Sequence, residues 1–289
     1  MIDEKLKEKL LISQKNEITE HFIYARLFAS TKDAHNKEIL KNISEEELKH
    51  YNVWKKYTNE DKKPDKLKIW FFFIISKVLG LTFGIKLMEK GEERAQISYE
   101  EIAKVIPEAD NIRHEEEKHE NDLVGLIDEE RLKYVGSMVL GLNDALVELT
   151  GALAGFTLAL QNVRLIAVTG LITGIAASMS MAASEYLSTK SERSNKVPFK
   201  ASLYTGFAYV LAVFLLVFPY FVFDNLYLCL GFTVFNAVFL IFIFTFYISV
   251  AMDMSFKKRF FEMAPLTLGI SALTFFIGFL VRVFLKIEV

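Results

Sequence analysis

Two long apolar segments lie next to each other near the middle of the chain, at 135–160 and 165–185, separated by a short polar link. Each is long enough to cross a bilayer core of about 30 Å at a rise of about 1.5 Å per residue. They nevertheless contain three carboxylic acids, Asp144, Glu148 and Glu185. A carboxylate near the membrane centre costs roughly 2.5–3.5 kcal/mol, so such acids usually face a polar pathway. The two segments therefore predict a membrane protein with a route for ions or protons.

Long apolar stretches continue to the end of the chain. We expect five transmembrane segments at 136–160, 165–188, 201–223, 226–250 and 264–285. Basic residues follow the second and fourth segments, and the cytoplasmic side of a membrane protein carries an excess of them. They are Lys190, Arg193, Lys196, Lys200, Lys257, Lys258 and Arg259, against Arg164, Arg282 and Lys286 on the other side. We therefore expect the N-terminal half to be cytoplasmic, and the protein to lie in the cell membrane of a prokaryote.

Charge is distributed unevenly along the chain. The net charge is −2, but charged residues are concentrated in 1–134 and are rare in the apolar segments that follow. This split predicts two domains, 1–130 and 131–289. The charged N-terminus lacks a compact apolar signal region, which agrees with a cytoplasmic location. The single cysteine, Cys229, excludes an intrachain disulfide and a cysteine-based metal cluster, and nothing in the sequence is typical of nucleic-acid binding.

Apolar residues at spacings of three and four predict helices at 4–30, 32–57, 67–105 and 110–128. The short links between these helices suggest an antiparallel four-helix bundle. The predicted fold class is therefore all-α, with this bundle followed by a five-helix transmembrane domain.

The stretch 69–88, inside the third predicted helix, is apolar enough to be a transmembrane span itself. A crossing there would place the first two helices on the opposite side of the membrane from the fourth, and the bundle could not assemble. We therefore expect this stretch to pack on the bundle, or to lie at the membrane interface with Lys77 and Lys86 reaching into the polar region.

Glu47 and His50 form an E-x-x-H pair in the second predicted helix, and Glu116 and His119 form another in the fourth. Residues three apart share a helix face, so each pair can aim a carboxylate and an imidazole at one point. Di-iron sites in bundles need two such pairs and one glutamate from each of the other helices. The predicted metal ligands are Glu17, Glu47, His50, Glu92, Glu116 and His119, with Glu89 as an alternative or additional ligand. The other interpretation is a solvated acidic face, and Glu20 is expected to face solvent.

Small residues dominate the first two membrane segments, whereas the last three are rich in Phe, Leu and Val. We expect the first two to form the tightly packed functional core and the last three a lipid-facing shell. Asp144 and Glu148 share one face of the first segment, and Met179, Met181 and Glu185 lie on the second. Thioether and carboxylate groups together can hold a partly dehydrated divalent ion. These residues predict a path for a transition metal.

The N-terminal half resembles the rubrerythrin branch of the ferritin-like family. The resemblance covers about residues 5–128 and rests on the motifs NEITEHFIY, EEELKHYNVW, MEKGEERAQISY and HEEEKHEND. It implies a carboxylate-bridged di-iron centre built from the six predicted ligands. Rubrerythrins also carry a cysteine-rich, rubredoxin-like iron module, which this chain cannot build. The resemblance therefore leaves iron sensing, iron capture or Fe(II) oxidation as roles for this half.

The membrane half resembles the vacuolar iron transporter family. The match is strongest in GLNDALVELTGALAG and SMSMAASEYLSTKSE, and the five-segment layout extends it over 135–289. It implies export of Fe(II) or Mn(II) from the cytoplasm in exchange for protons, by a homodimer whose pathway lies where the protomers meet. Carried over by position, the pathway residues are Asp144, Met181 and Glu185, with Asn143 and Glu148 as weaker candidates. Eukaryotic members carry an acidic metal-binding insertion after the second segment, and here the N-terminal bundle takes its place.

Two other readings remain open. The chain could be a membrane-anchored di-iron oxidase or peroxidase in which the five helices only tether the bundle, or the bundle could be a sensor whose iron occupancy gates transport. We expect transport to be the primary role, and no single catalytic residue stands out. Buried acids favour the transporter, because a simple anchor would not need them.

Overall fold

The computed structural model describes residues 4–93, 99–126, 133–192 and 196–285. All regular elements in these ranges are helices, so the prediction of an all-α chain with an N-terminal helical bundle is confirmed. The chain divides into two compact units, Met1–Glu129 and Glu130–Val289. Each unit is described by itself.

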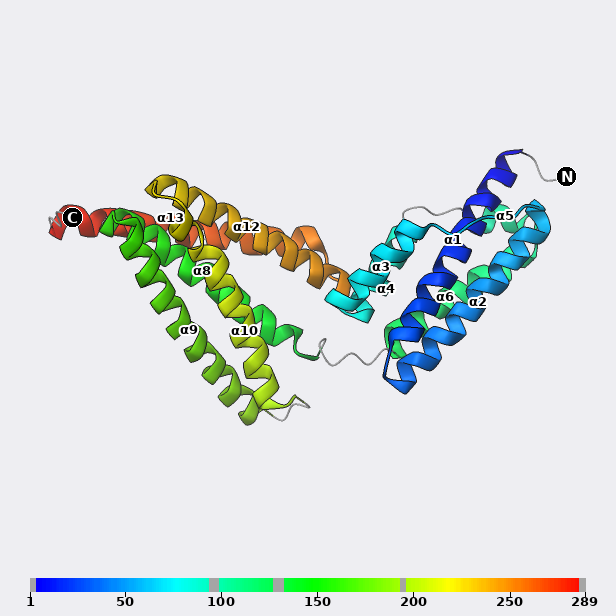
Figure 1. Ribbon diagram of the computed structural model, residues 1–289, viewed down its shortest axis with the longest axis horizontal. Coiled ribbons are helices and arrows are strands. Elements are labelled where there is room, and N and C mark those ends of the chain that lie inside the picture. Colours follow the sequence, from blue (N-terminus) through cyan, green and yellow to red (C-terminus); the bar gives the residue numbers. More distant parts are fainter. Residues whose placement is uncertain (1–3, 94–98, 127–132, 193–195, 286–289) are drawn as a thin grey trace. The chain divides into compact units, whose positions relative to one another are not determined.

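The first unit is built on a pair of long helices, α1 (Glu4–Ser30) and α2 (Ala34–Thr58), which lie side by side in Figure 1. The side chain of Asp33 begins α2 by accepting a hydrogen bond from the backbone N–H of Asn36 at 2.8 Å. Asn59 ends it in the left-handed conformation. Because α2 has a defined cap at each end, its predicted bounds agree with the structure to within about two residues.

The third predicted helix, 67–105, is wrong as a single element. The structure has α3 (Lys66–Leu79), α4 (Leu81–Glu93) and the short α5 (Tyr99–Ala103) in its place, followed by α6 (Glu108–Leu126). Gly80 ends α3 at a φ of 111°, which favours glycine, and α4 folds back onto α3. A Cβ at Gly84 would lie 1.9 Å from the Ser76 hydroxyl, so only glycine permits this approach. At 14 and 13 residues, α3 and α4 are each too short to span a membrane.

The described residues of the second unit form five helices long and apolar enough to cross a membrane, which agrees with the predicted number of spans. They are α8 (Val135–Leu160), α9 (Val163–Ser191), α10 (Pro198–Val217) with the short α11 (Pro219–Val222), α12 (Leu226–Ala251) and α13 (Phe256–Leu285). The last begins earlier than the expected residue 264. Lys257, Lys258 and Arg259 therefore lie in the first turn of α13 and not in a loop.

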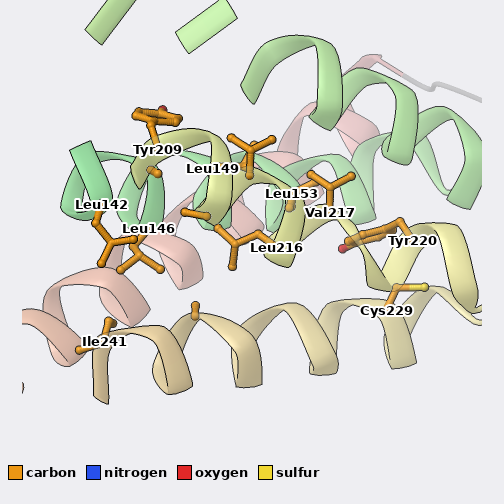
Figure 2. Close-up of a cluster of buried hydrophobic side chains, with 14 of the residues drawn as sticks. Leu142, Leu146, Leu149, Leu153, Tyr209, Leu216, Val217, Tyr220, Cys229 and Ile241 are labelled. Atoms are coloured by element: carbon orange, nitrogen blue, oxygen red, sulfur yellow. The ribbon is translucent and has the colours of Figure 1, made fainter. Parts of the chain in front are cut away.

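Apolar side chains of α8, α10 and α12 form the core of the second unit (Figure 2). The leucines of α8 recur at spacings of three and four and so form one stripe along the helix. They are Leu142, Leu146, Leu149 and Leu153, and they meet Tyr209, Leu216 and Val217 of α10. Cys229 and Ile241 of α12 close the cluster, and the buried Cys229 thiol hydrogen-bonds backbone carbonyls.

The expected division into a core of the first two spans and a shell of the last three is wrong for α10, which is as buried as α8. The helices with the most buried apolar surface are α8 and α10, whereas α9 leaves Ile172, Met179 and Leu187 exposed. The small residues of α8 allow α10 and α13 to approach it closely. A Cβ at Gly141, for example, would lie 2.4 Å from the Thr205 carbonyl oxygen of α10. Small side chains thus bring α8 close to its neighbours within the unit, while much of α9 remains uncovered.

Candidate functional site

Four predicted ligands of the first unit converge from three helices. Glu17 lies on α1, Glu47 and His50 lie on α2, and Glu116 lies on α6. Each offers one ligand atom, and these four atoms all lie within 4.8 Å of one another. The side chains of Glu17, Glu47 and His50 are almost completely buried, and that of Glu116 is 30% exposed. The bundle therefore holds three carboxylates and an imidazole at one point, with an open side at α6.

The imidazole of His50 points its Nδ1 into the carboxylates. This atom lies 2.9 Å from Glu116 Oε1, 3.7 Å from Glu17 Oε2 and 3.9 Å from Glu47 Oε2. A second imidazole, that of His119, stacks on His50 with 5.9 Å between ring centroids and has its Nδ1 3.9 Å from Glu47 Oε1. The side chains of Glu89 and Glu92, the ligands expected from the third helix, lie outside the described part of the structure.

The outer nitrogen of each histidine meets a glutamate from the opposite helix. His50 Nε2 lies 2.8 Å from Glu115 Oε2, and His119 Nε2 contacts Glu46 Oε2. The arrangement is reciprocal, because each of these glutamates immediately precedes the glutamate of an E-x-x-H pair. Carboxylates in this position orient metal-ligating imidazoles and raise their basicity. Sequence reasoning missed them, although the doubled glutamate in both motifs was a visible signal.

Two further contacts fix the acids of α1. The indole N–H of Trp54 donates a hydrogen bond to Glu17 Oε1 at 2.9 Å, and both side chains are buried. The expectation that Glu20 faces solvent is wrong, since Glu20 is 5% exposed and its carboxylate lies 3.7 Å from the Lys68 ammonium. Spacing explains this: Glu20 follows Glu17 by three residues and so lies on the same inward face of α1.

Burial and crowding shift the ionisation of the cluster. Burial, reinforced by the charges of Glu116 and Glu17, raises the pKa of Glu47 well above its usual range. Burial also raises the pKa of Glu116 to about 7, although His50 opposes this. Burial alone would lower the pKa of His50, but its contacts with Glu116 and Glu17 raise it to about 11. Protons thus compensate a surplus of buried negative charge, and a cation could replace them.

The donor set fits a transition-metal ion. Carboxylate oxygens and imidazole nitrogens suit iron, manganese and zinc. Among the described residues, Glu47 Oε2 and His119 Nδ1 are buried and have no hydrogen-bond partner. Both atoms belong to the cluster, and an ion bound there would give them a partner.

In the second unit, Glu185 of α9 is 8% exposed and bound by hydroxyl groups. Ser137 Oγ of α8 donates a hydrogen bond to Glu185 Oε1 at 2.5 Å, and Thr189 Oγ1 lies at 3.5 Å. Thr205 of α10 donates in turn to the Ser137 carbonyl at 2.9 Å. Three helices therefore hold this buried acid. None of these hydroxyl residues was predicted: Ser137 and Thr205 reach the site only through helix packing, whereas Thr189 follows Glu185 by four residues on α9 and could have been found from helix spacing.

The other predicted pathway residues lie on or beside α8. Glu148 is exposed and accepts a hydrogen bond from the buried Tyr209 hydroxyl at 3.0 Å, and Asp144 lies one turn earlier and is half-buried. Asn143 has a buried Oδ1 without a hydrogen-bond partner among the described residues. Met181 of α9 packs half-buried against the apolar core. In contrast with the first unit, no three Asp, Glu, His or Cys side chains described in this unit converge within ligand distance.

Comparison with known proteins gives a family match for part of the second unit. Residues 135–197, which include α8 and α9, match the model of the VIT family. No curated protein and no solved structure gave a significant match to the chain. Five long apolar helices together with this match show that the chain is an integral membrane protein with a VIT family domain at residues 135–197.

Proposed function

We propose that this protein exports Fe(II), or Mn(II), from the cytoplasm in exchange for protons. The observation that carries this proposal is Glu185, a carboxylate buried in a membrane-spanning helix within the stretch that matches the VIT family. Asp144 and Glu148 add two acids on the neighbouring α8. An anchor would gain nothing from buried acids, whereas a cation pathway needs them.

The pathway residues offer the donors that a divalent transition metal requires. Carboxylates of Asp144 and Glu185 neutralise its charge, Asn143 Oδ1 is a buried acceptor, and the thioether of Met181 is a soft ligand. A protonated carboxyl is a poor ligand, so protons arriving from the far side of the membrane would release the metal. Exchange with protons follows from this competition for the same oxygens.

A homodimer is part of the proposal. The uncovered part of α9 includes small residues where lipid-facing helices usually carry large apolar ones. Ala176, Ser180, Ala183 and Ser184 are exposed there, beside Met179, which is 69% exposed. Such a surface allows close approach of a second copy of the chain. The metal pathway would then lie where the protomers meet, with Met179 and Met181 on the same helix.

We assign iron capture at the cytoplasmic face to the first unit. Its converging carboxylates and imidazoles would hold a rubrerythrin-type di-iron centre, and a bound iron pair would supply Fe(II) storage and electron transfer. Glu17, Glu47, His50 and Glu116 would hold the metal, with His119 beside them. Glu92 completes the set on its sequence position alone. Glu46, Glu115 and Trp54 would hold the ligands in place.

Metal flux in proteoliposomes with an imposed pH gradient tests the transport proposal. We expect Asp144→Ala to abolish Fe(II) or Mn(II) flux, because the variant removes a charge that the dehydrated ion needs. Asp224→Asn is the matched control, since Asp224 is exposed in the connection before α12. Normal flux from Asp144→Ala would refute the assignment.

The buried cluster of carboxylates and imidazoles also supports a second candidate, a membrane-anchored di-iron oxidase or peroxidase. This function requires oxygen or peroxide consumption that survives Asp144→Ala, and no metal flux in the wild type. A sensor role is tested separately with Glu47→Ala. If the cluster gates transport, flux in this variant loses its dependence on iron concentration while the maximal rate remains.

A further inference from the structure

Helix α3 is apolar on two opposite faces. Ile69, Phe72 and Ser76 are buried against the bundle. On the opposite face, Leu67, Trp70, Phe71 and Val78 are between 54% and 84% exposed. Positions 67, 71 and 78 lie on one line along a helix, with 70 beside them. A helix of a water-surrounded bundle would carry polar side chains on its outer face.

Positive charge flanks this outer face. Lys66 and Lys77 lie along one edge of the helix and Lys68 along the other, and the sequence of α3 contains no acid. Lys77 donates a hydrogen bond to the Ser30 carbonyl at 2.9 Å, and Lys68 lies 3.7 Å from Glu20, so both reach away from the apolar centre. An apolar face with tryptophan and phenylalanine between lysines is the pattern of a helix in the membrane interface.

The first unit is joined by a short stretch of chain to helices that can cross a bilayer. The same chain carries five membrane-crossing helices, and α6 ends at Leu126 while α8 begins at Val135. The chain between these residues can extend over about 30 Å at most, at roughly 3.5 Å per residue. This covalent connection raises the effective concentration of the first unit at the membrane, which favours binding by a short amphipathic helix.

We propose that α3 lies in the interface of the bilayer that the same chain spans, with Leu67, Trp70, Phe71 and Val78 in contact with lipid. The exposed Lys66 beside them contacts the anionic headgroups. Docking of this kind would restrict how the first unit turns above the membrane. The inference is independent of whether the protein transports metal.

The two tryptophans of the chain provide the test, because Trp54 is fully buried while Trp70 is 58% exposed. The full-length protein is reconstituted in vesicles with lipids brominated near the top of the acyl chains, which quench nearby tryptophan. We expect loss of the Trp70 emission, and no loss in Trp70→Phe, in which only Trp54 remains. Phe71→Glu and Val78→Glu should restore the Trp70 emission. Ile12→Glu, a change at an equally exposed apolar position of α1, should not.

Two results would overturn the proposal. One is Trp70 emission that brominated lipid leaves unchanged while a water-soluble quencher abolishes it. The other is a contact between copies of the chain at this face. Phe71→Cys detects that contact, since the native Cys229 is buried and the new thiol would be the accessible one. A disulfide-linked dimer formed in high yield would mean that a second protomer, and not lipid, covers α3.

Discussion

Both units hold carboxylates away from water, but they arrange them differently. In the first unit, Glu17, Glu47 and Glu116 converge on His50, and their ligand atoms lie within 4.8 Å of one another. In the second, the buried Glu185 and the exposed Glu148 have separate hydroxyl partners, Ser137 and Tyr209. A convergent set binds an ion with several donors at once and keeps it. Separately satisfied acids bind more weakly and can pass an ion on, which suits a pathway.

The largest effect is expected when one of the converging acids of the first unit is removed. This change tests whether the first unit binds metal more tightly than the second. Glu47→Ala should weaken Fe(II) or Mn(II) binding to the full-length protein by more than about 100-fold, which exceeds the loss typical of an outer-shell change. It should leave flux at saturating metal near the wild-type rate, because the pathway acids are untouched. Metal titration and flux assays measure the two effects. Glu45→Ala, at an exposed position two residues away, is the control; equal losses in both variants would contradict a specific site.

Removal of the buried charge of Glu185 tests the second unit. Glu185→Gln keeps the size of the side chain and a hydrogen bond with Ser137, but removes the charge. We expect the loss of charge to raise the free-energy barrier for metal transport by at least about 1.4 kcal/mol. Metal flux would then fall at least tenfold. Metal binding to the first unit should remain unchanged. A variant with full flux would show that the buried charge of Glu185 has no part in the pathway.

A smaller effect is expected at the reciprocal glutamates. Glu115→Gln should weaken metal binding to the first unit by about 10- to 100-fold, because it loosens the orientation of the His50 ring. Glu117→Gln on the same helix is the matched control, since the side chain of Glu117 is 57% exposed and pairs with Arg113. If both variants bind metal equally well, Glu115 does not position His50.

The smallest effect is on stability as a function of pH. The pKa of Glu116 is about 7 in the folded protein and 4.5 in its ordinary state, and that of His50 is about 11 against 6.5. Both groups bind protons more tightly when folded, so the stability they contribute is full at low pH and is lost as pH rises through these windows. The lowered pKa of Glu17 acts in the opposite direction. We expect the metal-free first unit to melt at a lower temperature at pH 8 than at pH 5.

Trp54 emission in Trp70→Phe follows this transition in the full-length protein. Added metal should raise the melting temperature more at pH 8, where fewer protons compete for the ligands. A first unit that becomes more stable from pH 5 to pH 8 without metal would contradict the assigned shifts.

Most of the helices could be predicted, because apolar spacing and hydropathy are local properties. Gly80 shows where this fails: a glycine inside an apolar run is compatible with a continuing helix, and only the close approach of Gly84 to Ser76 makes it a reversal. The predicted metal ligands came from spacing on single helices. Glu115, Tyr209 and the other unpredicted partners act across helices, which spacing does not reveal.

The contact between Gly155 and Gly278 has a mechanical consequence. A Cβ at Gly278 would lie 2.3 Å from the Gly155 carbonyl oxygen, so the backbones of α8 and α13 touch there without side chains between them. Sliding of one helix along the other would make these backbones clash, so close packing holds α8 and α13 together as one body at this point. The contacts of Glu185 with Ser137 on α8 join the less covered α9 to this body. Any movement of α9 relative to α8 and α10 would therefore have to break this hydroxyl-to-carboxylate hydrogen bond together with the close packing of Gly174 on Val213.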